Sequence, residues 1–416
     1  MHISDSKFNM RLAWLVIAVS SIVFIEPSMS DVLCIGALAA FFAQGMRIPK
    51  GAGTAGILLL VYLLANVLSA SMAPEPATAF RALSIRFYMA AAWLLFTCLI
   101  YENPRKVLAS VWSAYTVAAL IAVTAGIVGY YEIIGPSHQL IENGRVRAFF
   151  KDPNVYGPFI VPVAMYALAR LETANRRQIW AFSALFAYCA FGILLGFSRG
   201  SWINFAVAMS LFMIVRLATQ RQGLLRQRML RITAAALIGG AVLIAGLAST
   251  DKVQAMLDQR LKVVQYYDMG EHGRLTNQLA IVKAVVVTPL GIGPGQSEQK
   301  YFFDMAPHNL YLHVLIESGW IGGLAFIFFA ALTLWRGRRF LHRSANVDAI
   351  HIASYACVVG VLAQSFFVDS THWRHFFLLI AMVWGPLLAW ENGLAQRHSQ
   401  AYQAAVSRHT RADGVA

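Results

Sequence analysis

Charged residues are scarce in this sequence. Asp, Glu, Lys and Arg make up 13% of the 416 residues, whereas hydrophobic residues make up 58%. Apolar runs long enough to cross a lipid bilayer recur from one end of the chain to the other. This pattern excludes an ordinary soluble core and predicts a polytopic membrane protein, with little room left for a separate soluble domain.

Acidic residues are scarcer than basic ones, so the chain carries a formal net charge of +14. The basic residues lie in short loops between apolar runs, and we therefore expect no nucleic acid among the partners. Cysteine is also rare, and every cysteine falls inside an apolar run, which argues against structural disulfides or a metal cluster. These residues are Cys34, Cys98, Cys189 and Cys357.

The apolar runs predict about twelve membrane-spanning helices, with boundaries good to a few residues. The expected spans are 11–25, 31–46, 53–71, 82–101, 107–130, 156–170, 178–197, 201–217, 230–248, 309–335, 350–368 and 374–391. The first run is not followed by a small-x-small cleavage site, so we expect it to be retained as a span. We predict one all-α transmembrane domain over residues 1–395 and a disordered tail over residues 396–416.

The basic residues also predict an orientation. If the N-terminus is cytoplasmic, every cytoplasmic loop contains Lys or Arg, as the positive-inside rule requires. The short outer turns near 26–30 and 369–373 then contain neither. Both termini and the tail are therefore expected in the cytoplasm, and two long segments, about 131–155 and 249–307, are expected on the outer side.

The second outer segment has helical periodicity, because apolar residues recur at intervals of three or four. We expect its helices to lie on the membrane surface or to cap the bundle. One set is Val253, Met256, Leu257, Leu261 and Val264, and the other is Leu275, Leu279, Val282 and Val286.

The most informative stretch follows this segment and runs from Ala306 into a hydrophobic helix. Pro307 fits the first turn of that helix, where the missing amide would be unpaired anyway. His308 then sits where lipid meets water, with an imidazole that can exchange a proton near neutral pH. The alternative reading is a histidine that caps the helix and anchors it at the interface. His308 and His313 are five residues apart, do not share a helix face, and do not suggest a metal pair.

Several basic residues depart from the positive-inside pattern, because they lie on the predicted outer side. They are Arg86, Arg145, Arg147, Lys151, Arg199 and Arg274. Arginine forks suit phosphate oxygens, so arginines gathered on one face suggest an anionic ligand such as a lipid diphosphate. Alternatively, each one reaches the headgroups or pairs with an acid. The chain has no Asp-x-Asp pair of the kind that holds a metal for nucleotide-sugar transfer, which favours a lipid-linked donor and metal-free chemistry.

Taken together, these residues resemble the signature of the bacterial O-antigen ligase and polymerase superfamily, which includes the Wzy-like polymerases. The similarity spans roughly residues 140–330. Its main motif is Pro307-His308-Asn309, followed by Leu312, Glu317, Gly319 and Gly322. Three further pieces match in order: Arg147 with Phe149, Pro153, Asn154 and Gly157; Ser198-Arg199-Gly200; and Arg274 upstream of Pro289-Leu290-Gly291 and Gly293.

The resemblance implies a GT-C-like glycosyltransferase of the bacterial inner membrane. Its active site would open to the periplasm and use an undecaprenyl-diphosphate-linked glycan, with no metal or other cofactor. His308 would be the base or orienting group for the acceptor hydroxyl, and Arg199 and Arg274 would hold the donor diphosphate, with Arg147 as a third candidate. The matching positions make Asn154, Asn309 and Glu317 further candidates for substrate binding.

The resemblance leaves the acceptor open. A ligase passes the glycan to lipid A-core or a similar acceptor, whereas a polymerase of surface polysaccharide passes it to another lipid-linked repeat. The same residues serve both reactions, and we lean slightly toward the ligase. The alternative from another class is a transporter, such as a flippase for lipid-linked sugars, but we find neither midplane charges nor internal repeats that favour it.

Overall fold

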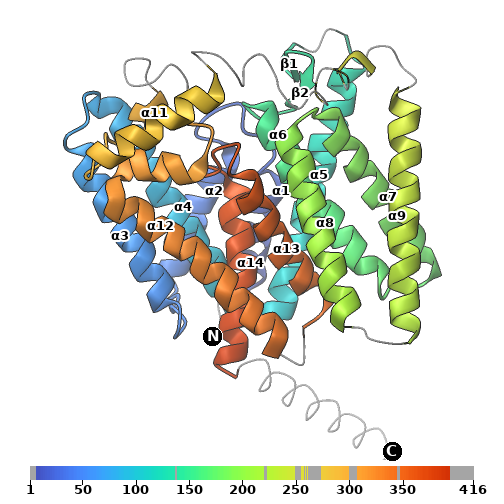
Figure 1. The fold of residues 1–416 in the computed structure, drawn as a ribbon. Helices are drawn as coiled ribbons and strands as arrows, with labels where there is room; N and C mark the ends of the chain where they lie inside the picture. The colour runs from blue at the N-terminus through green and yellow to red at the C-terminus, as the bar shows by residue number, and fades with distance from the viewer. Residues whose placement is uncertain are drawn as a thin grey trace, which may run out of the picture.

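The computed structural model describes residues 6–135, 138–219, 223–248, 254–256, 258, 260, 273–298, 307–343 and 347–393. Within these residues every regular element is a helix apart from one small hairpin (Figure 1). The elements are α1 (Lys7–Ala18), α2 (Met29–Ala43), α3 (Gly53–Ala70), α4 (Pro76–Glu102), α5 (Pro104–Tyr130), β1 (Ile141–Glu142), β2 (Arg145–Val146), α6 (Pro153–Leu171), α7 (Arg176–Leu195), α8 (Arg199–Thr219), α9 (Leu224–Ala248), α11 (Arg274–Val287), η3 (Gln296–Glu298), α12 (Leu310–Arg343), α13 (Ala349–Gln364) and α14 (Arg374–Glu391).

Each predicted span coincides with a helix, which confirms the all-α membrane class. Six of the described helices, α3, α4, α5, α7, α8 and α12, are long and apolar enough to cross a membrane. The total of about twelve crossings therefore stays a prediction. The first predicted span was too long: α1 ends at Ala18, where the Ser20 hydroxyl donates to the carbonyl of Ile17 at 2.7 Å. A serine that bonds to nearby backbone competes with helix continuation.

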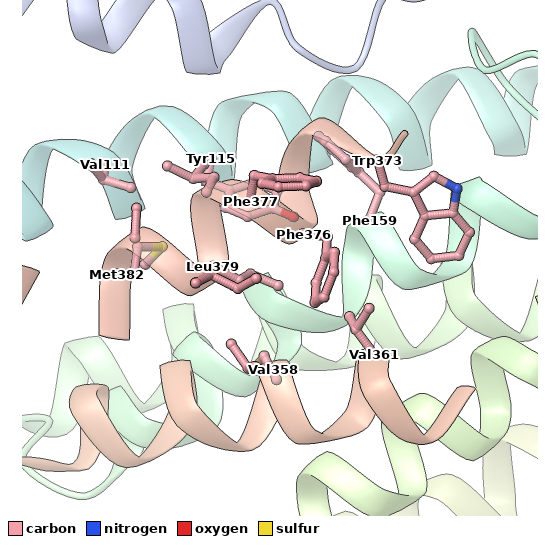
Figure 2. Close-up of a cluster of buried hydrophobic side chains, with 14 of the residues drawn as sticks. Val111, Tyr115, Phe159, Val358, Val361, Trp373, Phe376, Phe377, Leu379 and Met382 are labelled. Carbon is pink, nitrogen blue, oxygen red and sulfur yellow. The ribbon is translucent and has the colours of Figure 1, made fainter. Parts of the chain in front are cut away.

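The centre of the bundle is formed by α14, α13 and α6, which are apolar on all sides and buried along most of their length. Figure 2 shows this core, where Phe376, Phe377 and Leu379 of α14 meet side chains of α5, α6 and α13. On one side α4 packs on α14 and α3 packs on α12; on the other, α8 packs on α13 and α7 on α6. This core fixes the ends of α8, α12 and α13 relative to one another.

One end of the bundle carries the hairpin and α11 (Figure 1). We call it the His308 end, because α12 starts there. We did not predict the hairpin, although Asn143 and Gly144 both have positive φ and Asn-Gly is the strongest short hairpin signal. The helix predicted from Leu275 to Val286 is confirmed as α11. The periodic set from Val253 to Val264 lies almost wholly outside the described residues, as does the tail at 396–416.

Candidate active site

The start of α12 places His308. The helix begins at Leu310, and Asn309 caps it: its side-chain oxygen accepts from the amides of Tyr311 and Leu312 at 3.0 and 3.1 Å. The expectation that Pro307 belongs to the first turn is wrong, because an asparagine cap satisfies the first amides and leaves the proline outside the helix. His308, half-buried, has the left-handed backbone angle φ = 46°. Asn309 thus has a structural task within its own helix.

The His308 segment is bound to the C-terminal end of α13. The amide of Leu310 donates to the carbonyl of Ser365 at 2.9 Å, and the side chain of Asn309 donates to the carbonyl of Phe366 at 3.1 Å. These bonds satisfy carbonyls that lack a partner at the end of a helix. They hold the backbone beside His308 against residues 365 and 366.

Arg199 is brought to the same place by another helix. It is the first residue of α8, after a tight turn in which Phe197 has φ = 42°. A Cβ added to the adjacent Gly200 would lie 3.2 Å from Gln364, and the Asn204 amide donates to the Gln364 side chain at 2.9 Å. The segments that carry Arg199 and His308 therefore both contact the end of α13. The helix N-terminus at Arg199 adds its own partial positive charge.

The first long segment reaches the Arg199 turn through Arg145 and Asn154. Arg145 donates to the Asn154 side chain at 2.7 Å and to the carbonyl of Gly196 at 3.3 Å. Ser198 also donates to Asn154, at 3.2 Å. Asn154 therefore joins the hairpin, α6 and the α7–α8 turn. Arg147 stays within its own segment, where its Nε donates to the carbonyl of Gln139 at 3.0 Å.

The other two predicted residues, Arg274 and Glu317, are not shown beside His308. Arg274 is the first residue of α11, but its side chain lies outside the described residues, so its approach to His308 stays a prediction. Glu317 is fully buried, and its carboxylate accepts from the chain's own donors. Ser297 donates to it through its amide at 3.1 Å and its hydroxyl at 2.5 Å, and the amide of Gly295 donates at 2.8 Å.

Glu317 also belongs to a buried network that we did not predict. It forms an ion pair with Arg86 of α4, and His313 Nε2 lies 3.0 Å from it. The other ring nitrogen of His313 lies 3.5 Å from Asp369, between α13 and α14. Burial alone would raise the pKa of Asp369, but His313, His372 and the amide of Thr371 hold that pKa below its ordinary value. The i, i+4 spacing of His313 and Glu317 could have signalled their contact, whereas no local pattern points to Asp369.

These elements define a polytopic membrane protein with polar segments gathered at one end of its helices. Residues 184–327 match the model of the O-antigen ligase family. This confirms the resemblance to the O-antigen ligase and polymerase superfamily over the segment that contains Arg199, Arg274, His308 and Glu317. No curated protein matches the chain. Within the described residues, no group of three or more His, Cys, Asp or Glu side chains is arranged to hold a metal ion.

Proposed function

We propose that this protein transfers a glycan from an undecaprenyl-diphosphate-linked donor to an acceptor hydroxyl at the periplasmic face of a bacterial inner membrane. One observation carries the proposal: the segments of Arg199 and His308 are both held against the C-terminal end of α13. A cation and a proton acceptor at one place fit the transfer of a group from a diphosphate to a hydroxyl. The O-antigen ligase match includes both residues.

His308 is the proposed base or orienting group for the acceptor. A sugar hydroxyl is a weak nucleophile, and an imidazole within hydrogen-bond reach assists it by accepting the proton as the new bond forms. Because Asn309 caps α12 and bonds to Phe366, just past the end of α13, the backbone next to His308 is held in place. Attack from the side opposite the leaving diphosphate inverts the anomeric centre.

The proposed donor site is formed by Arg199 and Arg274. The leaving diphosphate gains negative charge as the glycosyl bond breaks, and guanidinium groups stabilise that charge without a metal. Arg199 is the first residue of α8, so the partial positive charge of the helix N-terminus lies beside it. Arg147, which is held in the hairpin segment, is a third candidate whose effect on the donor would be smaller.

The product of the reaction distinguishes the two possible acceptors. Ligase and polymerase chemistry need the same two functions, a proton acceptor and a diphosphate site. We favour the ligase, with lipid A-core or a similar acceptor. The alternative product is a longer glycan that remains on the lipid carrier.

The proposal is tested with purified protein in liposomes, an undecaprenyl-diphosphate oligosaccharide and candidate acceptors, all in the presence of a chelator. His308→Ala is expected to lower kcat by about 100-fold or more, the usual contribution of general-base catalysis. Arg199→Ala is expected to lower kcat/KM for the donor by about 100-fold, because it removes a charge that faces the leaving group. The size and carrier of the product distinguish ligase from polymerase.

Two matched variants serve as controls. His342→Ala changes an exposed histidine at the opposite end of α12, and Arg81→Ala changes an exposed arginine at the His308 end that pairs with Glu26. Both should retain transfer close to that of the wild type. If no acceptor supports transfer, while donor crosses the vesicle membrane independently of His308, the protein is a transporter and the proposal is wrong.

A further inference from the structure

Helix α12 is broken at Gly319, and the break receives a second segment of the chain. Gly319 has φ = 69° and ψ = −176°, which is not helical. In an unbroken helix, the amide of Trp320 would donate to the carbonyl of Ile316. Here it donates to the carbonyl of Pro289 at 2.9 Å, and the carbonyl of Ile316 accepts instead from Ile292 at 2.9 Å. The helix and the segment have exchanged hydrogen-bond partners.

We call the inserted segment, residues 289–297, the α12 turn. It approaches α12 more closely than side chains allow: a Cβ added at Gly291 would lie 2.5 Å from the carbonyl oxygen of Glu317, and one at Gly319 would lie 2.4 Å from that of Pro289. Both glycines also have positive φ. Such positions favour glycine on steric grounds alone. The contact is therefore built into the backbone on both sides.

The carboxylate of Glu317 completes this contact. Donors reach it from the α12 turn, through Gly295 and Ser297, and from the bundle, through Arg86 and His313. Hydrogen bonds to an ionised acceptor are stronger than those between neutral groups. Glu317 is fully buried about 10 Å along α12 from Leu310, given a rise of 1.5 Å per residue. A charge at that depth binds the turn to α4 and α12 at once.

The α12 turn lies between two segments that the proposed reaction uses. It follows α11, whose first residue is Arg274, and it precedes the His308 segment in the chain. Trp320, just after the break, donates from its indole to the carbonyl of Val285 in α11 at 2.7 Å. Displacement of the turn would therefore displace α11, the helix that begins at Arg274.

We propose that Glu317 is a positioning residue, not a substrate ligand: it fixes the α12 turn and thereby sets the place of α11, the helix that begins at Arg274. The role in transfer rests on the proposed function, whereas the effect on the turn does not. Folding should survive a change at Glu317, because Gln296 also binds the turn to the start of α4 through hydrogen bonds of 3.3 and 3.2 Å with the backbone of Glu75.

The test measures the place of α11 directly. Spin labels are attached at Lys283→Cys of α11 and Phe328→Cys of α12, both exposed positions, while the native cysteines are buried. We expect a single narrow distance distribution by electron spin resonance in the wild-type background. Glu317→Gln should broaden or shift it. Glu172→Gln, a matched change in the buried Glu172–Arg216 pair, should leave it unchanged.

A second pair of variants, each of which removes a single hydroxyl, separates the role of Glu317 from general misfolding. Ser297→Ala removes one donor to Glu317, whereas Ser354→Ala removes a buried hydroxyl that bonds within α13. The distance distribution should broaden slightly in the first and stay unchanged in the second. In the transfer assay, kcat/KM for the donor should fall by about 100-fold in Glu317→Gln, as expected when reacting groups are misplaced by about 1 Å.

The outcomes separate the two proposals. An unchanged distance in Glu317→Gln and Ser297→Ala would overturn the positioning role, and a raised donor KM with that unchanged distance would make Glu317 a direct ligand. A distance that changes in Glu317→Gln and not in Glu172→Gln supports the positioning role. If the wild type then transfers no glycan, the proposed function fails while the role of Glu317 in holding the turn stands.

Discussion

Two buried glutamate–arginine pairs lie toward opposite ends of the bundle. Glu317 pairs with Arg86 in the half nearer His308, and Glu172 pairs with Arg216 at the other end of α6 and α8. All of these side chains are at most 6% exposed. The two pairs therefore share their chemistry and their degree of burial, and they differ in what surrounds them.

The Glu172–Arg216 pair joins two helices that already pack on each other. Arg216 donates to the carboxylate of Glu172 through two nitrogens, which gives a fork of two bonds. By contrast, Glu317 accepts from Arg86 of α4, from His313 of its own helix and from the α12 turn. The first pair strengthens a contact between regular helices, whereas the second organises an irregular segment. Removal of the Glu317 carboxylate would take away the acceptor of the Gly295 and Ser297 amides, whereas removal of the Glu172–Arg216 pair leaves the backbone hydrogen bonds of both helices in place.

The largest expected effect comes from removing one partner of a buried pair, and replacing both partners by apolar residues then distinguishes the two pairs. Arg216→Met alone should cost about 3–5 kcal/mol of the free energy of unfolding, and the double variant with Glu172→Leu should regain most of it. Arg86→Met with Glu317→Leu should remain at least about 2 kcal/mol less stable than the wild type, because Gly295, Ser297 and His313 lose their acceptor. Thermal unfolding in detergent, followed by tryptophan fluorescence, measures both. Equal recovery in the two double variants would show that the turn does not depend on the carboxylate.

A smaller effect is expected from Gly319→Ala. This variant tests whether the His308 end depends on the break in α12, which the Glu172–Arg216 end lacks. The added Cβ would meet the carbonyl of Pro289, and alanine disfavours φ = 69°. We expect a loss of at least about 2 kcal/mol in unfolding free energy, together with weaker donor binding. The control is Gly56→Ala in α3, where an added Cβ meets nothing within 4 Å. That variant should be as stable as the wild type or more so, by up to about 1 kcal/mol.

The smallest expected effect is a dependence of stability on pH that arises from Asp369. Its pKa is lower in the folded protein than the ordinary value of about 4, so its ionised form stabilises the fold above that pH. This stabilisation is lost as the pH falls through the folded-state pKa. The loss begins as the pH falls below about 4, so unfolding temperatures measured from pH 7 down to pH 2 should fall at the acidic end, and less steeply in Asp369→Asn. Parallel curves for the two proteins would contradict the assignment.

The candidate site could be predicted in part. His308 and Arg199 were predicted from their setting in the sequence, and the structure shows that both of their segments contact the end of α13. Glu317 was identified by its place in the motif, but its partners lie in α4, in the α12 turn and beside Asp369. Asp369 and the exchange of bonds at Gly319 were missed. A pairing across such distances in the chain depends on which helices become neighbours, and one sequence does not contain that information.

The sequence by itself determined where the helices lie, because a long apolar run must satisfy its backbone polar groups internally in a lipid environment, and a helix does this locally. It also determined the turn before Arg199 and the polar start of α12, since both are marked by local residue types. The tertiary structure decided which polar side chains share a site. Glu317 is buried because α3, α4 and α12 pack together around it. A buried carboxylate is costly unless it is paired and hydrogen-bonded, so it binds the distant turn and Arg86.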